Sequence, residues 1–402
     1  MTSFSIAGRV RRIKPSPSTS AADRANELRR QGKPIISLVV GEPDFDTPSH
    51  IRQAAVIAMN NGATRYTSML GTLELRQAIA AKLARENGLN YALDEIIVTN
   101  GAKSAIYSAL AATVEAGDEV LIPAPYWVSY PDMVQACDGT PVTIACGENH
   151  GFKLGAAQLD AAITARTRWL IINSPSNPTG ASYTSAEYRA LADVLAKHPQ
   201  VMIMTDDIYE HIRFDGGRTP HLLSVAPELR DRTLAINGVS KTYAMTGWRI
   251  GWIAGPSELV TALGTLLSQS AGNCCSISQA AATAALNGDQ SFIAESVGTY
   301  QQRRDTILPR LNAIPGLSCR APDGAFYLFV NCAGLIGKTT PEGKRLKLDN
   351  DVVLYFLESV GVALVAGAAY GLSPYFRLSI ATSIQTLTEG VERMAVAVSK
   401  LS

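Results

Sequence analysis

The middle of the chain alternates short apolar runs with helical or turn-forming stretches. Seven β-rich runs stand out: IIVT (96–99), VLIP (120–123), PVTIAC (141–146), WLIIN (169–173), VMIMT (201–205), TLAIN (233–237) and IGWIAG (250–255). The first six are nearly continuously apolar, which is typical of parallel strands covered on both faces by helices. The connection to the seventh is too short for a helical crossover, so that strand is predicted to run antiparallel.

Helical periodicity surrounds these runs. The stretch 74–88 places Leu75, Ala78, Ile79 and Leu83 on one stripe and closes on Gly88, which predicts an amphipathic helix. A helix-rich stretch at 276–312 precedes a different pattern: GAFYLFV, a helix at about 350–360, VALV, FRLSI and a closing amphipathic helix.

Together these patterns predict an α/β protein with two domains. The large domain, residues 48–296, contains a mainly parallel, seven-stranded, doubly wound sheet with one antiparallel strand. Residues 1–47 and 297–402 form a smaller α+β domain, because the first 47 residues carry too little apolar surface for a core of their own.

Composition and charge exclude several classes of protein. The 402 residues, 47% hydrophobic and 18% charged, suit two packed domains and exclude disorder. Lys+Arg 36 against Asp+Glu 35 leaves no positive surplus to bind nucleic acid or an anionic membrane. We find no membrane-spanning run and no signal peptide, so the expected location is cytoplasmic and the expected partners are small molecules or a second copy.

Neither the cysteines nor the histidines form a recognisable metal-binding or disulfide pattern. The six cysteines include no C-x-x-C, and none of the five histidines has a cysteine at zinc-ligand spacing. We therefore expect reduced thiols and no metal.

Polar side chains follow four of the predicted strands. Asn100, Gly101, Ala102 and Lys103 come after IIVT, Asn177 follows WLIIN, Asp206 and Tyr209 follow VMIMT, and Ser240 and Lys241 follow TLAIN. Ligands of open parallel sheets bind at the carboxyl ends of the strands, so these groups are expected to meet. The small-residue turn at 100–103 opens a helix whose N-terminus would hold an anion.

This set of groups matches the needs of pyridoxal phosphate: an amine to bond the aldehyde, a carboxylate for the ring nitrogen, donors for the ring hydroxyl, and an anion site. Arg249 follows Lys241 by eight positions, where a guanidinium could grip a phosphate. Each residue alone is weak evidence for a cofactor site, because a lysine after a strand is usually a surface residue and Asn177 with Pro178 could simply form a turn.

Several motifs in one order give the chain its resemblance to a known family. They are KPS (14–16), GEPDFDTP (41–48), RYT (65–67), GAK (101–103), PYWVSYP (125–131), NSPSNPTG (173–180), DDIYEH (206–211), SKTYAMTGWRIG (240–251) and FRLSIATS (376–383). Over nearly its whole length, the chain resembles class I pyridoxal-phosphate aminotransferases, in particular the bacterial aspartate aminotransferase branch. The resemblance implies the aspartate aminotransferase-like fold and the cofactor pyridoxal 5'-phosphate.

The resemblance also implies roles for particular residues. Lys241 would form the Schiff base and shuttle the proton, Asp206 would pair with the ring nitrogen, and Tyr209 with Asn177 would donate to the phenolic oxygen. Trp127 would stack on the ring. The phosphate would be held by Gly101, Ala102, Ser240 and Arg249, with Tyr66 reaching in from a second subunit of a homodimer.

The substrate would bind beside the cofactor. Arg377 matches the residue that grips the α-carboxylate, and the strand period of FRLSI turns it away from Phe376 and Leu378. Gly41 would bring its backbone close to substrate, and Lys103, Ser16 and Ser18 would contact a distal carboxylate. Aspartate with 2-oxoglutarate or oxaloacetate is the first expectation.

Departures from the family pattern keep other substrates open. Some relatives use prephenate with a threonine where this chain has Ser18. Relatives usually carry proline where Ser68 stands, and Met69 and Leu70 make that loop more apolar. Asn273, Cys274 and Cys275 stand where small hydroxyl or alanine residues are expected near the neighbouring subunit's site. These changes favour a less polar pocket. Aromatic or specialised amino acids therefore remain alternatives to aspartate.

Other function classes compete with transamination. A pyridoxal-phosphate lyase or decarboxylase would use Lys241 and Asp206 equally, although Arg377 favours breaking the Cα–H bond. The stretch CAGLIGKT (332–339) imitates a nucleotide-binding loop, but Cys332 replaces the required first glycine. A cofactor-binding regulator without catalysis is the third class, and no basic arm supports it.

Overall fold

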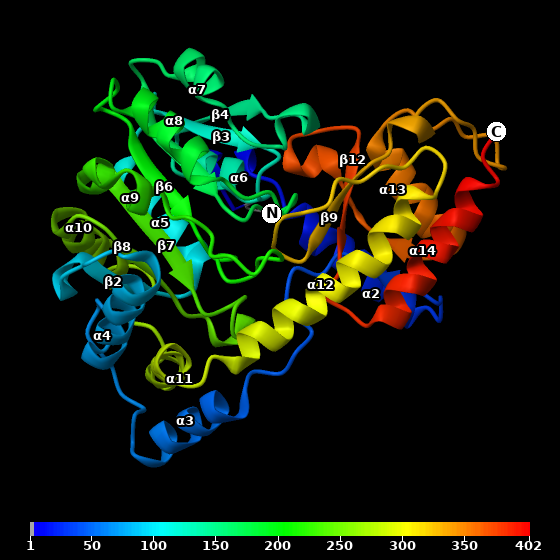
Figure 1. Ribbon diagram of the computed structural model, residues 1–402. Coiled ribbons are helices and arrows are strands. Elements are labelled where there is room, and N and C mark those ends of the chain that lie inside the picture. The colour runs from blue at the N-terminus through cyan, green and yellow to red at the C-terminus, as the bar shows by residue number, and fades with distance from the viewer. Residues whose placement is uncertain (1–3) are drawn as a thin grey trace.

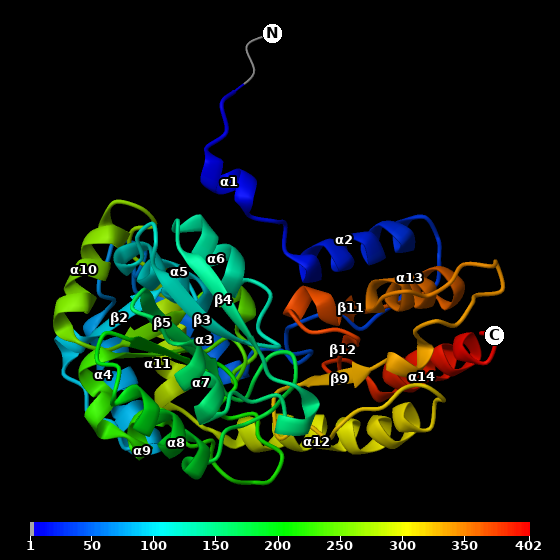
Figure 2. The same cartoon turned by 90° about the horizontal axis from the view of Figure 1, so that it is seen from above.

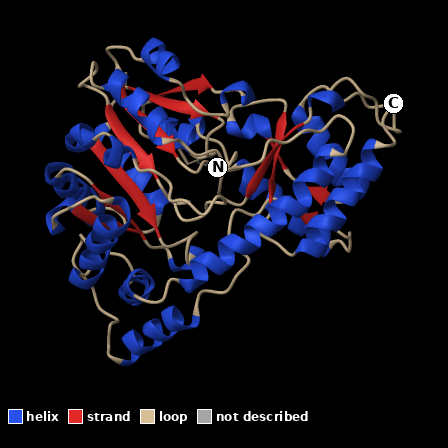
Figure 3. Ribbon diagram, in the orientation of Figure 1, coloured by secondary structure: helices blue, strands red, loops and turns tan. Residues whose placement is uncertain are grey.

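The computed structural model describes residues 4–402 and contains a seven-stranded sheet that carries the larger part of the molecule (Figures 1 and 3). In spatial order its strands are β2 (Ile96–Thr99), β8 (Gly251–Ala254), β7 (Thr233–Gly238), β6 (Met202–Asp206), β5 (Thr167–Asn173), β3 (Glu119–Ala124) and β4 (Thr140–Ala145). Strand β8 is antiparallel to both of its neighbours, and the remaining pairs are parallel. The predicted sheet, including its one antiparallel strand, is confirmed.

Helices cover both faces of this sheet, as its apolar strands require. One core involves α3 (Ser49–Asn60), α4 (Leu73–Lys82), α7 (Ala156–Ala162), α8 (Ser185–Leu195), α9 (Leu222–Val225) and α11 (Ser276–Asn287). The core on the opposite face involves α5 (Ala102–Thr113), α6 (Tyr130–Ala136) and α10 (Ser257–Ser268). Helices therefore cover both faces of the sheet, and a ligand is expected at the ends of its strands.

Strand β4 departs from the expectation that all six apolar runs are covered on both faces. It lies at the edge of the sheet and its residues are exposed or half-buried along its whole length. The other edge strand, β2, is fully buried because α4, α5 and α10 pack against it, whereas β4 is packed mainly by α6. The prediction of full coverage was wrong for this strand.

The helix expected at 74–88 is present but changes geometry partway. Helix α4 runs to Lys82 and continues as the π-helix η1 (Leu83–Asn87), which ends at Gly88 in the left-handed conformation. Insertions of this kind are rare and often lie near functional sites.

The smaller part of the molecule contains two short sheets. Strands β11 (Val365–Ala366), β12 (Tyr375–Ser379) and β9 (Tyr327–Asn331) form one, and β1 (Ile36–Ser37) pairs with β10 (Val362–Ala363) in the other. Helices α13 (Asp349–Val360) and α14 (Ile384–Val398) pack with them. The long helix α12 (Ser291–Asn312) runs between the two parts (Figure 1).

The N-terminal segment divides between the two parts. Helix α2 (Pro17–Arg30) packs beside α13, but α1 (Gly8–Arg12) lies against α6, where Arg12 pairs with Asp138 (Figure 2). The expectation that residues 1–47 pack onto the smaller unit therefore fails for α1, and residues 1–3 lie outside the described chain. The domain boundaries at 47/48 and 296/297 stay a prediction.

Two further sequence features have structural counterparts. After β9, residues Ala333–Leu335 form a single 3-10 turn, and an isolated bridge pairs Thr339 with Arg345, so no helix follows CAGLIGKT as a nucleotide-binding loop requires. Among residues 4–402, no helix is long and apolar enough to cross a membrane.

Candidate active site

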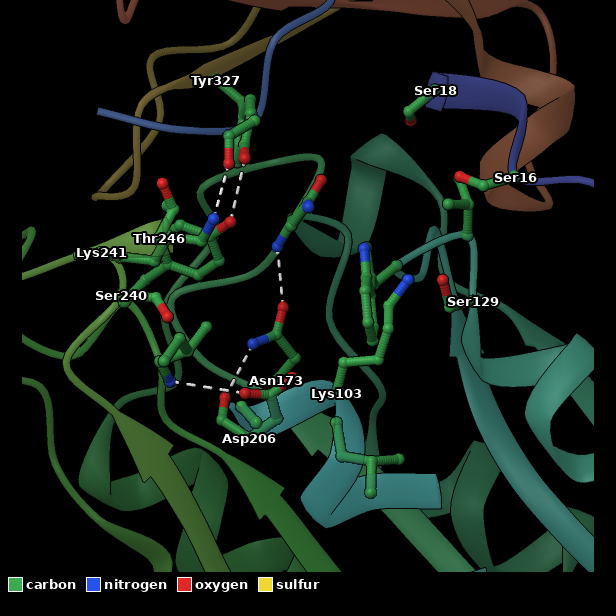
Figure 4. Close-up of a pocket in the computed structure, with 18 of the residues that line it drawn as sticks. Ser16, Ser18, Lys103, Ser129, Asn173, Asp206, Ser240, Lys241, Thr246 and Tyr327 are labelled. Atoms are coloured by element: carbon green, nitrogen blue, oxygen red, sulfur yellow. Dashed lines mark hydrogen bonds between the residues drawn. The ribbon is translucent and has the colours of Figure 1, made fainter. Parts of the chain in front are cut away.

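A cavity of about 280 Å³ opens at the carboxyl ends of the parallel strands. Its lining includes every predicted site residue except Gly101 and Tyr66: Ser16, Ser18, Gly41, Ala102, Lys103, Trp127, Asn177, Asp206, Tyr209, Ser240, Lys241, Arg249 and Arg377. Figure 4 shows Ser16, Ser18, Lys103 and Ser129 on one side of it and Lys241, Asp206 and Asn173 on the other. The structure therefore brings these predicted residues around one cavity, and their roles stay predictions.

Lys241 follows β7 and directs its amine into the cavity. Its Nζ donates a hydrogen bond to the carbonyl oxygen of Gly41 at 2.6 Å. Burial lowers the pKa of Lys241 to about 8; Glu42 opposes this shift, while Arg249 and Arg377 add to it. About a tenth of the amine is therefore neutral and nucleophilic at pH 7, far more than for an ordinary lysine.

Asp206 ends β6 and is buried. Its Oδ2 accepts a hydrogen bond from the hydroxyl of Tyr130 at 2.6 Å. Burial raises the pKa of Asp206 to about 6, helped by the neighbouring charge of Asp207 and opposed by the Tyr130 bond. The carboxylate is ionised at neutral pH, and a positive group placed against it would relieve its desolvation.

Gly101 and Arg249 build a concave site at the start of α5. Gly101 has φ +86°, and a Cβ on it would lie 2.5 Å from Nη2 of Arg249, so only glycine fits. Arg249 bonds the carbonyl oxygens of Thr246 at 2.8 Å and Asn100 at 3.3 Å. A guanidinium beside a helix N-terminus is a site for a phosphate.

Tyr209 contacts a residue that the sequence reading did not single out. Its hydroxyl lies 2.9 Å from that of Tyr327 in β9, and burial raises the pKa of Tyr209, so it stays protonated at neutral pH. A Cβ on Gly41 would lie 3.0 Å from the Tyr327 hydroxyl, so a side chain at position 41 would crowd Tyr327.

Arg377 lies in β12 and is only 2% exposed. It donates to Asn177 Oδ1 at 3.1 Å and to the carbonyl oxygen of Val39 at 2.5 Å, and its guanidinium covers the ring of Tyr327. As predicted, it points away from buried Phe376 and Leu378 and into the cavity. No acidic side chain of residues 4–402 pairs with it within ion-pair distance.

Lys103 forms part of the opposite wall. Its ammonium lies 4.9 Å from the ring centre of Trp127, and burial with the charge of Arg249 lowers the pKa of Lys103. Ser16 and Ser18 at the start of α2 also line this wall, and Ser18 Oγ is buried with no hydrogen-bond partner in the described chain.

Tyr66 lies apart from the cavity. It is 96% exposed and lines a separate hollow with Arg65, Thr72 and Ser276. Its contribution from a second subunit stays a prediction. Asn273, Cys274 and Cys275 also lie outside the cavity lining of this chain.

Sequence reasoning missed the cavity residues Asn173 and Tyr327, and also Tyr130, which lies outside the cavity lining but bonds Asp206. Tyr130 lies within PYWVSYP, three residues after Trp127, which is the spacing that places two side chains on one side of a helical turn. Asn173 ends β5, bonds the Asp206 carbonyl oxygen at 2.7 Å, and follows the same strand-end rule that identified Asp206. Nothing in GAFYLFV distinguishes Tyr327 from a core tyrosine.

The chemistry of these groups fits pyridoxal 5'-phosphate. The cavity offers an amine with a lowered pKa, a buried carboxylate without a cationic partner at hydrogen-bond distance, a protonated phenol, and a phosphate cradle that a Cβ would fill. These are the functions that the cofactor requires of its protein.

The family follows from comparison with known proteins. A family model described as aminotransferase class I and II matches residues 33–394. The chain belongs to this family and is an aminotransferase that uses pyridoxal 5'-phosphate.

Individual relatives point to one branch. The chain is 53% identical to an aspartate aminotransferase of Rhizobium meliloti, over 99% of this chain and 97% of that one. It is 51% identical to an aspartate/prephenate aminotransferase of Cereibacter sphaeroides, over 95% and 96%. Among solved structures, an aspartate aminotransferase from Rhizobium meliloti matches with TM-score 0.97 and 52% identity over 100% of both chains. One from Thermus thermophilus with maleate matches with TM-score 0.92 and 37% identity over 98% and 100%.

Proposed function

We propose that this aminotransferase transfers the amino group of L-aspartate to 2-oxoglutarate and regenerates aspartate from oxaloacetate. The charge balance of the cavity carries this proposal. Arg377, Lys103 and Arg249 line it without an acidic partner among residues 4–402. Arg377 is buried, whereas Lys103 and Arg249 are exposed, and a phosphate with a substrate dicarboxylate would offer these three cations one anionic group each.

Arg377 is proposed to bind the α-carboxylate and Lys103, with Ser16 and Ser18, the distal carboxylate. The two cations come from opposite walls, β12 and α5, so a short dicarboxylate could bridge them. The names of the relatives and the maleate in the Thermus structure, a four-carbon dicarboxylate, support this assignment.

The cofactor would be held by groups from several strand ends. Gly101, Ala102, Ser240 and Arg249 are proposed to bind its phosphate, Trp127 to cover its ring, and Tyr209 with Asn177 to bond its phenolic oxygen. When bound, the cofactor supplies an electron-withdrawing ring that stabilises negative charge on the substrate Cα.

Lys241 is proposed to hold the cofactor between turnovers and to move the proton. The substrate would displace the Lys241 amine from the cofactor. With its pKa lowered to about 8, this amine can take a proton from the substrate Cα at neutral pH and donate it to another carbon. Asp206, ionised at that pH, would hold a positive ring nitrogen. Tyr130 would position Asp206 through its hydrogen bond.

A panel of amino donors with 2-oxoglutarate tests the substrate. We expect aspartate to be the best donor, and Lys103→Ala to lower kcat/KM for aspartate by about 30-fold while sparing phenylalanine, because one charged contact of roughly 2 kcal/mol is lost. Equal loss on both donors would contradict the distal-carboxylate role. Release of ammonia or carbon dioxide from aspartate would instead favour a lyase.

Prephenate is the second candidate substrate. Ser18 Oγ lines the cavity close to the Tyr370 hydroxyl and is proposed to bond a substrate oxygen. Relatives named as aspartate/prephenate aminotransferases share about half of their residues with the chain. Prephenate belongs in the same assay as amino acceptor, with aspartate or glutamate as donor.

We also propose a homodimer with shared active sites and a cytoplasmic location. Exposed Tyr66, Leu73 and Met59 give the surface near α3 and α4 the apolar character of an interface. All six cysteines of the described chain are free thiols, which supports a reducing compartment.

A further inference from the structure

A cluster of charged and amide side chains is buried behind the cavity wall. Its members are Lys82, Glu86, Asn87, Glu210, His211, Asn237 and Thr242, which we call the Lys82 network. Lys82 is 1% exposed, and no member lines the cavity. Three separate segments supply them: the end of α4 with η1, the loop after β6, and the end of β7 with the loop beyond it.

Glu210 is the centre of the Lys82 network. Its Oε1 accepts from the Lys82 ammonium and from Asn237 Nδ2 at 2.5 Å, and its Oε2 accepts from Asn87 Nδ2 at 2.8 Å. Lys82 donates a second bond to Asn87 Oδ1 at 2.8 Å. Burial alone would raise the pKa of Glu210, but the Lys82 charge and these bonds lower it to about 2, so the carboxylate is charged and fully bonded.

A second set of bonds in the network reaches the loop that carries Lys241. Glu86 lies 3.6 Å from the Lys82 ammonium and bonds His211 Nε2 at 2.8 Å. His211 Nδ1 then lies 3.1 Å from Thr242 Oγ1. The π-helical turn η1 supplies two members of the network, Glu86 and Asn87.

Two members of the network are sequence neighbours of residues proposed to act on substrate. Glu210 directly follows Tyr209, and Thr242 directly follows Lys241. In both pairs the first side chain lines the cavity and the second bonds within the network. The same bonds therefore connect the backbones of the two catalytic segments from behind.

A bound metal ion is the competing explanation of this cluster. Glu86, Glu210 and His211 carry potential ligand atoms within 4.8 Å of one another. However, the Lys82 ammonium already lies beside both carboxylates and supplies the positive charge between them. The geometry favours an ion pair over a metal site.

Stability alone is a weak reason for such a network, because apolar replacements of buried ion pairs are often as stable. We propose that Lys82 and Glu210 are positioning residues, which fix the backbones of Tyr209 and Lys241 in the arrangement that transamination requires. This inference rests on the proposed roles of those two residues.

The test compares Lys82→Met, Glu210→Gln and the double variant as holoenzymes. Lys82→Met leaves the buried Glu210 carboxylate without its lysine partner, so its melting temperature should fall below that of the double variant, in which neither position 82 nor position 210 carries a charge. In the double variant we expect kcat to fall at least about tenfold with KM within roughly twofold, because a small displacement of a catalytic group is costly. The pH midpoint of the cofactor absorbance should shift by on the order of half a unit.

Lys153→Met is the matched control, since Lys153 is also largely buried and pairs with Glu187 at 2.6 Å, away from the cavity. It should lower the melting temperature without moving kcat or the absorbance midpoint. If the double variant behaves like this control, the network is only structural and the inference is wrong. A divalent ion that stabilises the wild-type protein but not Glu210→Gln would likewise overturn it.

The Lys241→Ala variant distinguishes failure of the proposed role of Lys241 from failure of the positioning inference. If that variant keeps its activity, the proposed role of Lys241 fails. If it is inactive while the Lys82 and Glu210 variants match the control, only the positioning inference fails.

Discussion

Asp206 combines a negative charge with deep burial, and this combination makes the cofactor-free protein sensitive to pH. Its pKa is about 6 in the folded chain against 3.8 ordinarily, so its contribution to stability is full below about pH 4 and is lost as the pH rises through 6. The cost at neutral pH is about 3 kcal/mol. Bound cofactor would offset it with a positive ring nitrogen.

Urea unfolding of cofactor-free wild type and Asp206→Asn measures this cost. We expect the free energy of unfolding of wild type to fall by about 2.5 kcal/mol relative to the variant between pH 4 and pH 8. Taking the difference between the two proteins cancels the titration of all other groups. A constant difference across that range would show that the pKa of Asp206 is not raised.

Arg377 is a buried guanidinium that bonds only neutral oxygens among residues 4–402. Arg377→Lys keeps the charge but loses the two-pronged geometry that matches a carboxylate. We expect KM for aspartate to rise about 30-fold, equivalent to roughly 2 kcal/mol. Arg393→Lys, on the surface of α14, should leave KM unchanged, and a similar rise in both variants would contradict the assignment.

At the scale of elements, the turn from β2 into α5 is packed against the strand beside it. Both Gly101 and Gly251 lie at this contact, and a Cβ on Gly251 would lie 2.5 Å from the Ala102 nitrogen. The cradle is thus formed by backbone from two antiparallel neighbours, β2 and β8, and its shape depends on the absence of side chains.

Gly101→Ala should weaken cofactor binding at least about tenfold, because the new Cβ would displace Arg249. Gly117→Ala is the matched control: Gly117 also has positive φ, +104°, but nothing lies within 4 Å of its would-be Cβ. Both variants carry backbone strain, and only the first should raise the dissociation constant measured by cofactor titration. Equal effects would mean that strain alone is responsible.

The elements also show what the sequence could and could not reveal. Continuous apolar runs were sufficient to find the seven strands, and the strand-end rule placed Asp206, Asn177 and Lys241 around one cavity. The exposure of β4 was missed because composition does not say how many helices will pack against a strand. Tyr327 was missed because its function depends on β9 lying across the cavity from β6, a contact between distant segments.

At the scale of the whole molecule, Tyr66 decides whether a single chain supplies all the residues of its proposed active site. Tyr66 is exposed and lies outside the cavity of its own chain, which agrees with a contribution to a partner's site. The family resemblance places it at the phosphate, where it would need to cross a subunit boundary.

Mixed dimers of Lys241→Ala and Tyr66→Ala chains test this sharing. If Tyr66 acts across the boundary, the mixed dimer contains one site with both residues intact and should recover activity that neither parent dimer has. If Tyr66 acts within its own chain, every site remains defective and mixing restores nothing. Size-exclusion chromatography of the same samples checks that mixed dimers form.

The most direct test of the whole account is the covalent bond between the cofactor and Nζ of Lys241. Holoenzyme is reduced with borohydride, digested and analysed by mass spectrometry. We predict a stable pyridoxyl group on the peptide that contains Lys241. When Lys241 is replaced by alanine, we predict that this peptide carries no such group. A modified lysine elsewhere, or no modification of cofactor-loaded protein, would contradict it.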